Sequence, residues 1–112
     1  MKWPGILALA LLFTAVLLDV SPAAAEPDYA AARLALVEEL RTYASRDPTL
    51  PGGEIDERVI QVLGAVKRHE FVPESQRRQA YANHPLPIGH GQTISQPYIV
   101  ALMTDLVRPD PD

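Results

Sequence analysis

The stretch Leu86–Pro97 constrains the fold of this chain most strongly, because its prolines and glycines leave few backbone conformations open. Two prolines in segment 85–88 remove two backbone donors, so this segment is predicted to be an edge strand or an extended connection. Gly89-His90-Gly91 then frees the backbone for unusual dihedral angles. A helix is predicted to follow, with Ser95 as its N-cap and Pro97 in its first turn, where the missing N–H is tolerated.

Hydrophobic periodicity predicts two helices before this stretch. The first is expected over residues 29–45 and the second over residues 56–67, each beginning after an aspartate N-cap, Asp28 or Asp56. Prolines and glycines in segment 47–53 predict a loop between them. The predicted buried stripes are Ala32, Leu36, Val37, Leu40, Tyr43 and Ala44 in the first helix, and Val59, Val62, Leu63 and Val66 in the second.

The remaining predictions concern the irregular segment around residues 71–82 and the helix that begins near Pro97. Residues 74–82 are expected to form one or two irregular helical turns, and Phe71 is expected to anchor the core. The last helix is predicted to end at Arg108-Pro109. Its apolar stripe is Tyr98, Ile99, Leu102, Met103 and Leu106. The expected fold class is therefore mostly α, with no sheet to cover the helices.

The N-terminus has the layout of a secretory signal peptide. Lys2 provides a positive charge, residues 5–18 are apolar, and Ala23-Ala24-Ala25 supplies small residues for cleavage before Glu26. The apolar run is short for a membrane span, which requires about 20 residues. We therefore predict a signal peptide over residues 1–25 and an exported chain. An uncleaved anchor and a misplaced start site are the alternatives.

Composition excludes several classes of function. The net charge of −4 offers no electrostatic basis for binding nucleic acid. The chain contains no cysteine, which excludes disulfides and thiolate metal sites. His69, His84 and His90 match no common spacing of metal ligands, so each is interpreted as a surface or loop residue. No Gly-x-Ser-x-Gly motif surrounds Ser95, which disfavours a serine hydrolase.

Ser95 permits two interpretations from its position alone. A serine before a helix most often only caps it. Alternatively, the free N–H groups of the first turn hold a carboxylate or phosphate, and the hydroxyl donates to that anion. Lys67, Arg68, Arg77 and Arg78 form a second candidate anion site, although Glu70 and Glu74 nearby favour a solvated and self-compensated surface.

Residues 55–107 resemble a known family over about half of the chain. The resemblance rests on Glu70-Phe71-Val72-Pro73, then Ala80-Tyr81, then Leu-Pro-Ile-Gly-His-Gly-Gln-Thr-Ile-Ser-Gln-Pro-Tyr-Ile-Val-Ala-Leu-Met-Thr. These motifs are similar to the N-terminal region of protein-L-isoaspartate O-methyltransferases. Ala82-Asn83 departs slightly, at positions where many members carry acidic or other polar residues.

The resemblance implies an enzyme that methylates the free carboxylate of L-isoaspartyl residues, using S-adenosylmethionine, and thereby begins protein repair. It implies an α/β Rossmann-like methyltransferase fold, of which residues 26–112 are an N-terminal helical part. The catalytic serine of the family maps to Ser95, while Gln92, Thr93, Ile94 and Ser95 map to the loop that lines the cofactor and substrate site. No metal is implied, the partners are isoaspartyl peptides and proteins, and the chain is expected to be a monomer.

Two features depart from the family. The chain reaches Asp112 before the strand and glycine-rich turn that bind S-adenosylmethionine in the family, so we predict an incomplete fragment that is inactive alone. Most members are cytosolic, so the signal peptide conflicts with the family and leaves a cytoplasmic location as the alternative. The rival functions are an exported, non-enzymatic module that binds peptide carboxylates, with no stable membrane anchor after cleavage, and a non-functional remnant.

Overall fold

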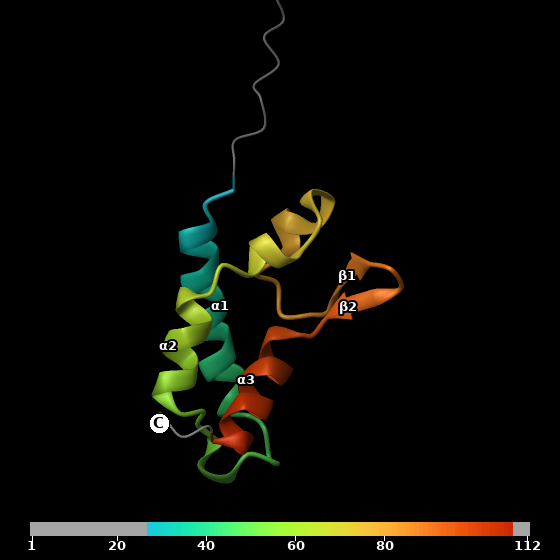
Figure 1. The fold of residues 1–112 in the computed structure, drawn as a ribbon. Coiled ribbons are helices and arrows are strands. Elements are labelled where there is room, and N and C mark those ends of the chain that lie inside the picture. The colour runs from blue at the N-terminus through green and yellow to red at the C-terminus, as the bar shows by residue number, and fades with distance from the viewer. Residues whose placement is uncertain (1–26, 109–112) are drawn as a thin grey trace, which may run out of the picture.

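The computed structural model describes residues 27–108, which are mostly helical, as the sequence predicts (Figure 1). The predicted signal peptide and the tail from residue 109 lie outside the described residues. Short 3-10 segments connect the main elements. The helices (α), 3-10 segments (η) and strands (β) are, in chain order, α1 (Tyr29–Ala44), η1 (Pro51–Gly53), α2 (Glu57–Ala65), η2 (Arg68–Phe71), η3 (Glu74–Gln79), β1 (Leu86–Gly89), β2 (Gln92–Ile94) and α3 (Pro97–Val107).

The two predicted aspartate caps are confirmed. Oδ1 of Asp28 accepts the N–H groups of Ala30 and Ala31 at 3.1 and 3.0 Å. Oδ1 of Asp56 accepts the N–H of Arg58 at 2.8 Å. These bonds satisfy donors of the first turn that have no partner inside the helix.

Helix α2 is shorter than predicted. The backbone at Val66 is extended (φ −67°, ψ 128°), so α2 ends at Ala65, and Arg68 and His69 belong to η2. Arg68 and His69 therefore lie beyond the last turn of α2. Residues 74–79 form the short irregular helical segment that the sequence predicts, η3.

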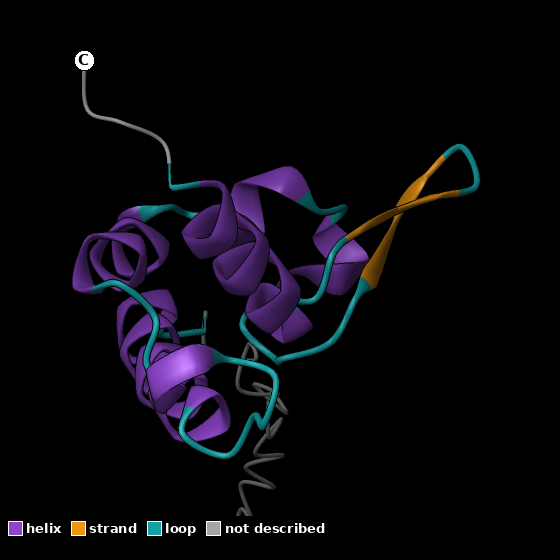
Figure 2. Ribbon diagram, turned by 90° about the horizontal axis from the view of Figure 1, so that it is seen from below, coloured by secondary structure: helices purple, strands orange, loops and turns teal. Residues whose placement is uncertain are grey.

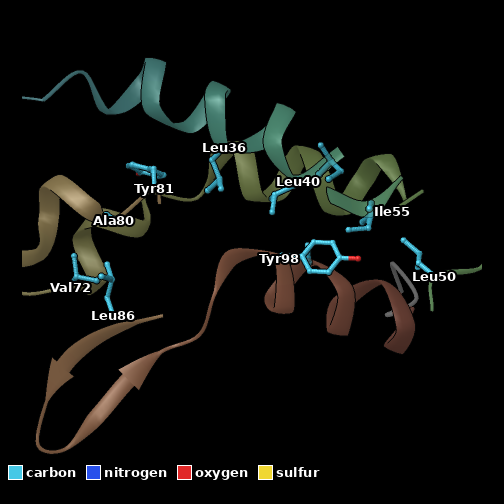
Figure 3. Close-up of a cluster of buried hydrophobic side chains, with 12 residues drawn as sticks. Leu36, Leu40, Leu50, Ile55, Val72, Ala80, Tyr81, Leu86 and Tyr98 are labelled. Carbon is cyan, nitrogen blue, oxygen red and sulfur yellow. The ribbon is translucent and has the colours of Figure 1, made fainter. Parts of the chain in front are cut away.

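The core lies where α1, α2 and α3 contact one another, and it continues between η3 and β1 (Figure 3). Leu40 is fully buried and Ile60 is 2% exposed. Burying aliphatic side chains of this size stabilises a fold by about 1.5–3 kcal/mol each. The buried apolar residues are Leu36, Leu40, Ala44, Leu50, Ile55, Ile60, Val72, Ala80, Tyr81, Leu86, Tyr98 and Ala101.

Several predicted core residues are exposed. Phe71 is 64% exposed, and its neighbour Val72 is buried in its place. In α3 the buried residues Tyr98 and Ala101 face the core, while Met103, Leu106 and Ile99 lie on another face and are exposed. Val62, Val66 and Tyr43 are also exposed. The apolar stripes are wider than the surface that the described residues cover, so periodicity overestimates burial here.

Beside the helices the described residues form a small antiparallel sheet, which includes the edge strand that was one of the two predictions for segment 85–88. Strands β1 and β2 pair Leu86 with Ile94 and Pro87 with Thr93, and an irregularity precedes the turn. The turn has positive φ angles at Gly89, His90 and Gly91 (95°, 54° and 67°), conformations that glycine adopts readily. Segment 85–88 is thus extended, as predicted, and the hairpin projects from the helices (Figure 2).

The described part of the chain was also searched for membrane-spanning helices. None of its helices has both the length and the apolar character needed to cross a bilayer.

Candidate functional site at the junction of the hairpin and helix α3

Ser95 lies between the end of β2 and the start of α3, and its side chain is exposed. It is not the N-cap that the sequence predicts. Gln96 holds that position with an extended backbone (φ −52°, ψ 134°), and its side chain forms no capping bond. The physical reason is that a residue preceding proline avoids the helical region, so Gln96 stays extended and Pro97 begins the helix.

The cap of α3 comes instead from a residue that sequence reasoning overlooked. Oδ1 of Asn83 accepts the N–H of Tyr98 at 3.0 Å. Asparagine is a favourable capping residue, but it normally caps the helix that follows it directly. Fifteen residues separate Asn83 from Tyr98 in the sequence, so no local pattern signals this bond.

This arrangement leaves fewer free backbone N–H groups for the anion site predicted at the N-terminus of α3. Pro97 has no N–H, and the N–H of Tyr98 is already bonded to Asn83. Two first-turn positions therefore offer no free donor to a bound carboxylate. The Ser95 hydroxyl has no hydrogen-bond partner among the described residues, so it remains available to a ligand.

The structure brings the other predicted site residues next to Ser95, on a strand instead of a loop. Gln92, Thr93 and Ile94 form β2. Ile94 is half-buried, pairs with buried Leu86 and packs against the core, so it anchors the strand. Gln92, Thr93 and Ser95 are exposed, and because side chains alternate along a strand, Gln92 and Thr93 point to opposite faces of the hairpin.

A buried arginine supports the turn before the hairpin. Arg68 is 9% exposed; its Nε donates to the carbonyl of Ala80 at 2.7 Å, and its Nη2 donates to the carbonyl of His84 at 3.4 Å. Burial lowers the pKa of the Arg68 guanidinium, and the nearby Tyr81 hydroxyl partly opposes this effect. The predicted solvated basic cluster is therefore wrong for Arg68, whereas Arg77 and Arg78 are exposed as expected.

The histidines occupy different environments. His69 is half-buried, stacks on Tyr29 with ring centroids 3.9 Å apart, and shares a 2.7 Å hydrogen bond between its Nδ1 and the Tyr81 hydroxyl. It joins α1 to η2 and is not a simple surface residue. His84 and His90 are exposed, as predicted. Within residues 27–108 no group of three His, Asp or Glu side chains is arranged to hold a metal.

A polar pair lies beside the start of α3. The hydroxyl of Tyr98 donates to Oδ2 of Asp47 at 2.6 Å. Burial and this bond raise the pKa of Tyr98 to about 12. Hydrogen bonds from Thr49 and Tyr98 lower the pKa of Asp47. An open groove runs past this pair from Gln96 toward the 46–48 loop.

The described residues do not form a nucleotide-type cofactor site. Such a site places a glycine-rich turn between a parallel strand and a helix. The sheet described for residues 27–108 is an antiparallel hairpin, and Gly89 and Gly91 lie at its open tip, where an added Cβ would meet no atom within 4 Å. The residues present therefore do not fit S-adenosylmethionine.

A mostly helical fold with a small antiparallel hairpin is compatible with the N-terminal part of a methyltransferase. The sequence profile of the family Protein-L-isoaspartate(D-aspartate) O-methyltransferase (PCMT) matches residues 48–112, which include the hairpin, Asn83 and Ser95. The chain belongs to this family.

Individual relatives agree with the family match. The chain is 64% identical over 77 residues to Protein-L-isoaspartate O-methyltransferase 2 of Polaromonas sp., which is 69% of this chain and 34% of the relative. It is 52% identical over 98 residues to Protein-L-isoaspartate O-methyltransferase 1 of Cupriavidus necator, which is 87% of this chain and 38% of the relative. The chain thus spans about a third of the length of these relatives.

Proposed function

We propose that this chain is the substrate-facing part of a protein-L-isoaspartate O-methyltransferase, which transfers the methyl group of S-adenosylmethionine to the free carboxylate of an L-isoaspartyl residue for protein repair. The family match across residues 48–112 carries this proposal. The exposed Ser95 hydroxyl, which is not consumed by capping α3, supports it.

The chemistry suits the residues around Ser95. An ionised carboxylate is already a nucleophile, so methyl transfer needs close approach and orientation more than acid–base catalysis. Gln92, Thr93 and Ser95 are exposed, uncharged polar residues close together in the chain, and they do not repel the carboxylate. We assign Ser95 the catalytic role of a donor to the substrate carboxylate, and Gln92, Thr93 and Ile94 the lining of the site.

A hybrid enzyme tests the proposed activity. The stretch of the Cupriavidus necator relative that matches this chain is replaced by the corresponding residues of this chain. We expect the hybrid to transfer labelled methyl groups from S-adenosylmethionine to an L-isoaspartyl peptide and not to the same peptide with ordinary aspartate. A folded hybrid that leaves both peptides unmethylated contradicts the proposal.

A pair of serine variants tests the site within the hybrid. Ser95→Ala should lower kcat about tenfold, which corresponds to about 1.4 kcal/mol of lost transition-state stabilisation, with little change in cofactor affinity. The matched control is Ser75→Ala, because Ser75 is also exposed but lies on η3. Equal turnover of the two variants would reduce Ser95 to a connecting residue.

Location and assembly are further parts of the proposal. Residues 1–25 are proposed to direct export and to be removed, which leaves a monomer without a stable membrane anchor. Mass spectrometry of the periplasmic fraction should then find a chain that begins at Glu26. Recovery of the uncleaved chain in the cytoplasm would contradict export and agree with the location of most of the family.

A further inference from the structure

The first turn of α3 needs a hydrogen-bond acceptor from outside the helix. Pro97 occupies the first helical position and has no N–H, so Tyr98 carries the first donor of the turn. Both residues are buried, which keeps water from this donor. An unpaired buried N–H is strongly unfavourable, so another part of the chain has to supply the acceptor.

Asn83 supplies this acceptor, because its Oδ1 lies 3.0 Å from the Tyr98 nitrogen. The N-cap residue itself, Gln96, makes no capping bond with its side chain. A serine close to a helix start would ordinarily be drawn into this task. Since Asn83 already performs it, the hydroxyl of Ser95 is left without an internal partner in the described structure.

Arg68 fixes the turn that carries Asn83. Its guanidinium bonds the carbonyls of Ala80 and His84, which flank Asn83 on both sides in the sequence. Backbone bonds within segment 79–84 tighten the same turn, from Ala82 N–H to the Gln79 carbonyl and from His84 N–H to the Ala82 carbonyl. Asn83 is therefore presented to α3 by a turn whose shape is held on several sides.

We infer that Asn83 is a positioning residue for methyl transfer, because it caps α3 in place of Ser95 and so keeps the Ser95 hydroxyl free for the isoaspartyl carboxylate. This inference rests on the proposed function and names the residue on which the Ser95 geometry depends. Asn83 acts through the start of α3 and does not itself touch the substrate.

Amide hydrogen exchange tests the capping bond in the 112-residue chain. Asn83→Ala should speed exchange of the Tyr98 amide about tenfold or more relative to the unaltered chain, because the acceptor is lost. Asn83→Asp keeps an acceptor at the same place and should keep Tyr98 protected. Exchange of Tyr98 that is equally fast in all three chains would overturn the inference.

A double-mutant cycle in the hybrid enzyme tests the link to Ser95. Asn83→Ala should lower kcat about fivefold when Ser95 is present and less than about twofold when Ser95→Ala is already introduced, because coupled residues are non-additive. Asn83→Asp should restore most of kcat. Asp28→Ala is the matched control, because it removes the α1 cap far along the chain and should lower kcat equally in both backgrounds.

The outcomes separate this inference from the proposed function. The positioning role is overturned if the hybrid methylates the peptide but Asn83→Ala lowers kcat by the same factor in the presence and absence of Ser95. The proposed function would still stand in that case. A parent hybrid that is folded but inactive contradicts the proposed function itself, while the exchange of the Tyr98 amide still decides whether Asn83 caps α3.

Discussion

The helical core around Leu40 and the junction around Ser95 are held together by different interactions. In the core, aliphatic side chains from α1, α2 and α3 bury one another. At the junction, polar side chains bind backbone groups: Asn83 binds the Tyr98 N–H, and Arg68 binds two carbonyls. Gln92, Thr93 and Ser95 stay exposed. The hairpin that contains β2 projects from the helices (Figure 2).

This difference shows how a small domain can present an open site and remain folded. Apolar burial supplies most of the free energy of folding but covers the side chains that it uses. Hydrogen bonds contribute less but are directional, so they set the position of a backbone segment while leaving its neighbours accessible. Truncations in the core should therefore affect stability most, and truncations at Ser95 should affect stability least.

The largest effect is expected from Leu40→Ala. Leu40 is fully buried, so its truncation should destabilise the chain by about 2–5 kcal/mol through lost burial and a residual cavity. Thermal unfolding followed by circular dichroism measures the change. Leu34→Ala is the matched control, since Leu34 lies on the same helix and is 68% exposed. Similar losses in the two variants would refute the assignment of Leu40 to the core.

An intermediate effect is expected from Arg68→Met. This change leaves the carbonyls of Ala80 and His84 without their donor and should cost about 1–3 kcal/mol in the free energy of unfolding. Urea denaturation measures it, with Arg77→Met as the control because Arg77 is exposed on η3. If the two variants are equally stable, the polar support of the junction is unimportant.

A smaller, pH-dependent effect is expected from Tyr98→Phe, which should cost about 1 kcal/mol at neutral pH by removing the bond to Asp47. The folded-state pKa of Tyr98, about 12, lies above the ordinary value of about 10, so its hydroxyl stabilises the fold fully below pH ~10. That contribution is lost as the pH rises toward about 12. Melting temperatures measured across this range should fall less steeply for Tyr98→Phe than for the unaltered chain. Parallel curves would argue against the raised pKa.

The smallest effect on stability is expected from Ser95→Ala. Because Ser95 is exposed and caps no helix, its removal should change the free energy of unfolding by less than about 0.5 kcal/mol. By contrast, Asp28→Ala removes a genuine cap and should cost about 1 kcal/mol. If Ser95→Ala lowers the free energy of unfolding as much as Asp28→Ala does, Ser95 caps a helix after all.

Features set by neighbouring residues were predictable from the sequence. Asp28 and Asp56 cap helices that begin directly after them, and segment 85–88 is extended because of its prolines. The family was also recognisable, because its motif from Leu86 to Pro97 is continuous in the chain and the family profile confirms it. In each case the interacting groups are close in sequence, so a local pattern records them.

Features set by distant partners were not predictable. Phe71 and Met103 follow apolar patterns but are exposed, because burial depends on which surfaces meet across the fold. The capping of α3 by Asn83 and the burial of Arg68 depend on partners that lie 12 to 16 residues away in the sequence. No sequence period encodes such spacings.

The sequence by itself thus determined the helices, their local caps, the extended proline segment and the family of this chain. Only the tertiary structure decided that Asn83 caps α3 and that Ser95 does not. The physical reason is that one buried N–H can be satisfied by any acceptor that the fold brings within about 3 Å, and the chain's path decides which acceptor arrives. At this junction that choice leaves the Ser95 hydroxyl exposed and open to a ligand.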